Sequence, residues 1–75
     1  MPTITLKQSR IVYTKISFAD EPDVYDMRKL RKAFGRTLNC RTKSSETRHV
    51  VLVEGDKRTE VQSLLNDWGI SFRPE

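Results

Sequence analysis

The sequence has few of the residues from which small proteins build disulfide frameworks, metal sites or phosphate loops. Its 75 residues include one cysteine, Cys40, and one histidine, His49. A single cysteine forms no intramolecular disulfide, and this pair falls short of the three or four converging ligands of a zinc site. The three glycines are isolated from one another, so the sequence has no glycine-rich phosphate loop. We therefore expect no metal and no cofactor.

Long hydrophobic runs are also missing. The longest uninterrupted apolar run is residues 50–53, far short of the roughly 20 residues of a membrane span. Residues 1–7 lack the charged-then-apolar order of a signal peptide. We expect a cytoplasmic protein without a membrane partner.

Length and composition favour one small globular domain. Of the 75 residues, 36% are hydrophobic and 32% are charged. A domain of this size buries only about 60% of the surface that its unfolded chain exposes, so its core is thin. An enclosed catalytic pocket is not expected in such a core. We therefore expect a single domain over residues 1–75 that is not an enzyme.

Alternating apolar residues predict several strands. Residues 3–18 alternate in two registers, which predicts one long strand or a tight hairpin that turns at residues 8–10. The polar stretch 39–47 predicts a short strand followed by a loop. Ile70 and Phe72 indicate a short final strand.

The clearest predicted strand is residues 48–54. One parity of this strand carries His49, Val51 and Val53, which we assign to the covered face of the sheet. The open face then carries Arg48, Val50, Leu52 and Glu54.

A 3.6-residue period predicts a first helix over roughly residues 20–36. Asp20 is its predicted cap and Pro22 falls in its first turn, where the missing amide costs nothing. Gly35 is expected to end or loosen the helix, and Leu38 to add one more turn. Its buried stripe contains Val24, Met27, Leu30 and Phe34, with Ala33 beside them.

A second helix is predicted after Gly55. Asp56 is its predicted N-cap, because a carboxylate there accepts amide protons that the first turn leaves unpaired. Gly69 fits the left-handed position that closes a helix. The buried stripe of this helix is Val61, Leu64, Leu65 and Trp68.

The predicted element order is β(β)αββαβ. Two amphipathic helices must bury their apolar stripes against the apolar face of a sheet. The sequence therefore predicts an α+β fold, a two-layer sandwich with both helices on one face of a mostly antiparallel sheet.

Positive charge is the most informative surface feature. Fourteen Lys and Arg face ten Asp and Glu, a net charge of +4, which favours a polyanionic or acidic partner. The acidic residues lie near the start of the first helix and the basic ones follow, an order that the helix dipole explains in part. The basic excess predicts a positive ridge that contacts phosphates, and a plain solvated surface is the alternative. The ridge residues are Arg28, Lys29, Arg31, Lys32 and Arg36, and a second group contains Arg41, Lys43, Arg48, Lys57 and Arg58.

Two further features have competing interpretations. Tyr13 is expected on the open sheet face beside Ile11 and Lys15, where it stacks on a base or contributes to an apolar surface that docks a protein. Cys40 and His49 on adjacent strands would suggest a nucleophile and base, but nothing supplies an orienting third group. A packed thiol and a strand-end histidine are the favoured interpretation.

Residues 53–58, with Val61, Leu64, Leu65 and Gly69 after them, form a recognisable pattern. A strand ends in Gly-Asp-Lys-Arg and opens a helix with a Val-x-x-Leu-Leu face that closes at glycine. In this span, and more loosely over residues 27–72, the chain resembles the translation initiation factor one family of eukaryotes and archaea with its stand-alone bacterial relatives.

The resemblance implies two helices on one sheet face and binding to the small ribosomal subunit near the decoding site, where the family helps to select the start codon. It also implies that Lys57 and Arg58 match the basic pair of the motif, and that the first-helix cations match a region that faces ribosomal RNA.

Our leading hypothesis is a non-enzymatic RNA- or ribosome-binding module that modulates translation. The alternative is a small protein-binding adaptor or inhibitor that uses the open sheet face against an acidic protein partner. The predicted RNA contacts are Arg28, Lys29, Arg31, Lys32, Arg36, Arg41, Lys43, Lys57 and Arg58.

Overall fold

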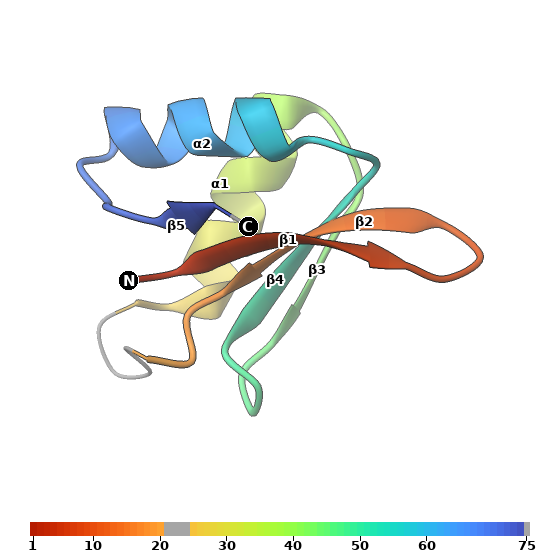
Figure 1. The fold of residues 1–75 in the computed structure, drawn as a ribbon, viewed down its shortest axis with the longest axis horizontal. Coiled ribbons are helices and arrows are strands. Elements are labelled where there is room, and N and C mark those ends of the chain that lie inside the picture. The colour runs from red at the N-terminus through yellow and green to blue at the C-terminus, as the bar shows by residue number, and fades with distance from the viewer. Residues whose placement is uncertain (21–24, 75) are drawn as a thin grey trace.

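A single sheet of five strands forms one layer of the structure, and two helices form the other (Figure 1). The computed structural model of the chain describes residues 1–20 and 25–74. The strand order is β3-β4-β2-β1-β5, and all neighbours are antiparallel except β1 and β5, which are parallel. The predicted α+β sandwich is confirmed. Its elements are β1 Thr3–Gln8, β2 Val12–Ser17, α1 Met27–Leu38, β3 Thr42–Ser45, β4 Val50–Glu54, α2 Arg58–Asp67 and β5 Arg73–Pro74.

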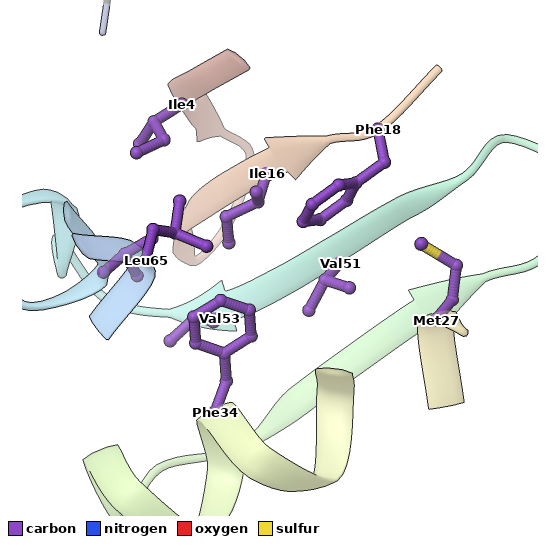
Figure 2. Packing of buried hydrophobic residues seen from close by; sticks show 9 residues of the cluster. Ile4, Ile16, Phe18, Met27, Phe34, Val51, Val53 and Leu65 are labelled. Atoms are coloured by element: carbon purple, nitrogen blue, oxygen red, sulfur yellow. The ribbon is translucent and has the colours of Figure 1, made fainter. Parts of the chain in front are cut away.

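The core lies between the sheet and both helices (Figure 2). Val51 and Val53 are fully buried, so the predicted covered face of β4 is confirmed. His49 does not extend that face, because it lies in the turn before β4 with a left-handed φ of 54°. The buried apolar cluster contains Ile4, Ile16, Phe18, Met27, Phe34, Val51, Val53, Val61 and Leu65.

The N-terminal stretch is a hairpin. β1 and β2 pair with Ile4 opposite Ile16 and Leu6 opposite Thr14, and residues 9–11 form the loop. Residues directly opposite each other in a sheet lie on the same face, and residues along a strand alternate between faces. The apolar residues of β1 and those of β2 therefore lie on one face of the sheet.

The first helix begins later than predicted. Its cap is Asp26, whose Oδ1 accepts hydrogen bonds from the amides of Arg28 and Lys29 at 2.9 and 3.3 Å. The predicted cap, Asp20, instead accepts from the N-terminal amine at 3.2 Å. Proximity of that amine lowers the pKa of Asp20. Pro22 and Val24 lie outside the described residues.

Gly35 does not end the helix, which continues to Leu38. A Cβ at this position would lie 3.2 Å from Thr42 Oγ1 and 3.5 Å from the Cys40 carbonyl oxygen. Glycine therefore permits close approach of α1 to β3, and Asn39 provides the left-handed residue that closes the helix, with φ of 52°.

Hydrogen bonds from Thr14 of β2 hold the turn between β4 and α2 in place. This threonine is fully buried, and its hydroxyl donates to the Gly55 carbonyl oxygen at 2.8 Å and accepts from the Lys57 amide at 2.7 Å. The Gly55 amide also donates to the Val12 carbonyl oxygen at 2.7 Å, with Gly55 at a φ of 92°. The cap position is Lys57, one residue after the predicted Asp56, and its amide is satisfied by the sheet. The Asp56 carboxylate still accepts a first-turn amide proton as predicted, from Arg58 at 3.5 Å.

Half of the predicted stripe of the second helix is buried, Leu64 is partly buried and Trp68 is exposed. Val61 and Leu65 are fully buried, and the Trp68 ring lies 5.1 Å from that of Phe34 although Trp68 is 37% exposed. Gly69 is left-handed as predicted, with φ of 72°.

The final strand is displaced toward the C-terminus. Ile70 and Phe72 pack against the core instead of pairing, and Arg73 donates its amide to the Pro2 carbonyl oxygen at 2.8 Å. β5 therefore consists of Arg73–Pro74 and lies beside β1.

Replacing Thr14 with valine should destabilise the fold by about 1–3 kcal/mol, because the isosteric side chain leaves the Lys57 amide without its acceptor. Thr14→Ser keeps the hydroxyl and loses one methyl group, so it should cost about 1 kcal/mol. Urea unfolding monitored by tryptophan fluorescence measures both values. A valine variant as stable as the parent would contradict the fastening role of the hydroxyl.

Candidate functional site

The sheet face opposite the helices carries basic side chains on β2 and β3, the two strands that flank β4. Cross-strand pairing places Lys15 of β2 opposite Leu52 of β4, and Leu52 opposite Lys43 of β3. These residues alternate with core residues, so their side chains point away from the helices. Leu52 is thus flanked by two lysines, one on each neighbouring strand.

A hollow of about 220 Å³ lies on this open face. Lys7, Lys15, Lys43 and Arg48 line it, with the β4 residues Val50 and Leu52 also in its wall. No carboxylate of the described residues lies within 4 Å of these four cationic groups. We call these four residues the open-face cluster.

A second, more open groove of about 450 Å³ lies where β3 begins and β4 ends. Lys43 lines both hollows, and its Nζ lies 5.3 Å from the centroid of the Tyr13 ring. The predicted position of Tyr13 on the open face is confirmed by the pairing of the strands. The groove is lined by Ile11, Tyr13, Arg31, Arg41, Thr42, Lys43 and Glu54.

The basic residues of α1 divide between two directions. Lys29, Lys32 and Arg36 are exposed and, at 3.6 residues per turn, lie on the side of the helix away from buried Met27 and Phe34. Arg31 is half-buried and lines the groove. The remaining helix cation, Arg28, is exposed.

Lys57 and Arg58, the basic pair of the sequence motif, are engaged with local carboxylates. Lys57 Nζ lies 3.8 Å from Glu60, and Arg58 donates to both carboxylate oxygens of Asp56 at 3.0 Å. The Arg58 guanidinium therefore holds the pKa of Asp56 below its usual range, and Asp56 raises the pKa of Arg58. This pairing leaves less of their charge for an external anion.

The structure brings together three of the nine predicted contacts, Arg31, Arg41 and Lys43, in the groove. Sequence reasoning did not include Lys7, Lys15 or Arg48 among the contacts. Lys7 and Lys15 could have been predicted from the alternation of residues in the hairpin, because they have the same parity as Tyr13 and lie on the same face.

Cys40 and His49 lie at opposite ends of the β3–β4 hairpin. Cys40 precedes Arg41, whose carbonyl oxygen accepts from the Glu54 amide, whereas His49 precedes Val50 at the other end of β4. Four residue steps of strand separate these ends by about 13 Å, too far for a nucleophile and its base. Burial raises the pKa of the Cys40 thiol above its ordinary value.

Residues 1–20 and 25–74 contain no group of three or more side chains placed to hold a metal ion. No helix in these residues has the length and apolar character needed to cross a bilayer.

A scan against protein-family models and a search of curated proteins found no match to this chain.

The Asp56–Arg58 pair gives a pH prediction. The Asp56 carboxyl should titrate below the usual range of an aspartate, and Arg58→Gln should bring its pKa back up toward that range. Because the folded pKa is lowered, any contribution of the pair to stability is present above the usual aspartate pKa and lost as pH falls through the folded value. Carbon-detected NMR titration of the side-chain carboxyls measures this. An Asp56 pKa unchanged by Arg58→Gln would show that the pair does not form.

Proposed function

We propose that this protein is a non-enzymatic RNA-binding module that holds single-stranded RNA against the open face of its sheet. The observation that carries the proposal is the open-face cluster, in which four cations without a carboxylate neighbour among the described residues surround a hollow. Tyr13 lies beside the cluster with Lys43 Nζ over its ring, so an unpaired base that takes the place of this lysine would stack on the ring.

The chemistry of the cluster suits phosphate oxygens. Lysine ammonium groups are point charges on flexible stems, which adapt to a backbone without reading its sequence. Lys15 and Lys43 flank Leu52 across neighbouring strands, so their charges lie along one row of the sheet. Such contacts release counterions, and binding should weaken steeply as salt rises.

The resemblance to the initiation factor one family favours the small ribosomal subunit as the source of this RNA. In that reading the exposed α1 cations Lys29, Lys32 and Arg36 supply a second contact, on the helical side of the molecule. A module with positive charge on two sides fits a site between RNA segments, and it modulates translation by occupying that site.

Two triple variants with the same loss of charge separate the surfaces. Lys7→Gln with Lys15→Gln and Lys43→Gln should weaken binding of a ten-nucleotide single-stranded RNA at least tenfold more than Lys29→Gln with Lys32→Gln and Arg36→Gln. The open-face triple should also reduce the slope of log affinity against log salt by about 2, at roughly 0.7 for each lost phosphate contact. Fluorescence anisotropy at several salt concentrations measures both quantities.

Equal losses in the two triples would mean that net charge alone attracts the RNA. A larger loss in the helix triple would place the contact on α1 and contradict the open-face proposal. Circular dichroism of both triples controls for folding.

A second candidate function is a protein-binding adaptor. The observation that favours it is apolar exposure at the hairpin tip, where Ile11 is 47% and Val12 is 37% exposed. Val50 is only 8% exposed, so Val50→Asp would bury a charge and test folding rather than docking.

Ile11→Ser combined with Tyr13→Ala tests the adaptor directly. If an acidic protein docks on the open face, this double variant should weaken the complex at least tenfold, because the exposed apolar anchors are removed. Isothermal titration calorimetry measures the change, and Ser63→Ala provides the control of an exposed residue on the helical side. An unchanged complex would exclude the open face as its docking surface.

A further inference from the structure

Glu54 is the one acidic residue among the outward-facing positions of β1, β2, β3 and β4. It ends β4, is half-buried, and lines the groove beside Tyr13. An acid in the middle of a basic surface weakens attraction for phosphates, so its presence there calls for a separate explanation.

The neighbouring cations do not provide one. Arg31, Arg41 and Lys43 line the same groove, yet none places a nitrogen within 4 Å of the Glu54 carboxylate. Within the described residues this carboxylate also accepts no hydrogen bond. Glu54 therefore lines the groove with a carboxylate whose two acceptor oxygens have no hydrogen-bond partner among the described residues.

An aromatic ring stands next to these acceptors. Tyr13 and Glu54 are direct cross-strand partners, which places their Cβ atoms about 5 Å apart. Lys43 Nζ lies over this ring, 5.3 Å from its centroid, so a flat base would stack there by displacing that flexible side chain. Its edge would then extend toward the carboxylate. Arg31 and Arg41 on the wall of the groove are placed for the phosphates on either side of that base.

We infer that the groove between Tyr13 and Glu54 is a guanine-selective base site. Guanine presents two adjacent donors, N1–H and the N2 amino group, and an ionised carboxylate is an acceptor at both oxygens. Adenine and cytosine each present a donor beside an acceptor, and uracil has one donor between two carbonyl groups, so none of them matches both oxygens of Glu54.

This inference rests on the proposed RNA-binding function and adds a base preference to it. The same chemistry would accept guanine in a single-stranded RNA or in a free guanine nucleotide. Contacts from the open-face cluster to neighbouring phosphates favour the RNA, because a mononucleotide reaches few of these cations.

The test uses the full chain and uridine octamers that carry one central guanosine, adenosine, cytidine or inosine. The parent should bind the guanosine octamer about tenfold more tightly than the adenosine octamer. Inosine lacks the N2 amino group and should fall between them. Glu54→Ala should reduce the guanosine preference to within twofold, while Glu46→Ala, which removes an acid from the exposed β3–β4 turn, should keep it.

Failure of the guanine site and failure of the RNA-binding function give different results in this test. Binding of all octamers with equal affinity, or a guanosine preference that survives Glu54→Ala, overturns the guanine site and leaves the RNA-binding function. No binding of any octamer, with none of guanosine monophosphate, overturns both. Guanosine monophosphate bound as tightly as the guanosine octamer supports the site but assigns it to a free nucleotide.

Discussion

The hydroxyl of Thr14 links the two layers of this protein at the point where the chain passes from one to the other. It donates to the Gly55 carbonyl oxygen and accepts from the Lys57 amide, so the start of α2 is held by the middle of β2. The side chain of the cap residue Lys57 makes no capping hydrogen bond, and Asp56 accepts only a long one, 3.5 Å from the Arg58 amide. The direction of this helix, and with it the burial of Val61 and Leu65 over the sheet, follows from that attachment.

A chain of this size has enough apolar residues to cover one face of its sheet. Both helices lie on that face, so every strand that contributes to the core also presents a second row of side chains to the outside. In β2 the core residues Thr14 and Ile16 alternate with Tyr13 and Lys15, and β4 alternates in the same way. The packing of the core therefore fixes which basic residues meet on the open face.

Features set by local pattern were predictable from the sequence, and features set by the path of the backbone were not. The buried parity of β4 and the stripe of α2 follow from periodicity within a few residues. The caps do not, because Asp26 rather than Asp20 precedes the first core residue of α1. At α2, Asp56 accepts from the Arg58 amide as predicted, but the shorter bond at the helix start, from the Lys57 amide to Thr14, comes from the sheet. The glycine inside α1 is explained by a contact with Thr42 that no local pattern contains.

The candidate site also has one part that was predictable from the sequence and one part that was not. A run of cations in one helix is visible in the sequence, so the α1 ridge was predicted. The open-face cluster combines residues 7, 15, 43 and 48, which only the strand order and register bring together. The ion pairs of Lys57 and Arg58 were likewise not predicted from the sequence, although each pair joins residues that are close along the chain.

The most direct test of the open face as an RNA-binding surface is a map of amide chemical shifts in the ¹⁵N-labelled protein as single-stranded RNA is added. Saturable shifts along β2, β3 and β4 and in the turn at residues 46–49, with the outward side of α1 unchanged, are the result expected. Shifts confined to α1 residues 28–36, with the amides of the sheet unchanged, would contradict RNA binding on the open face.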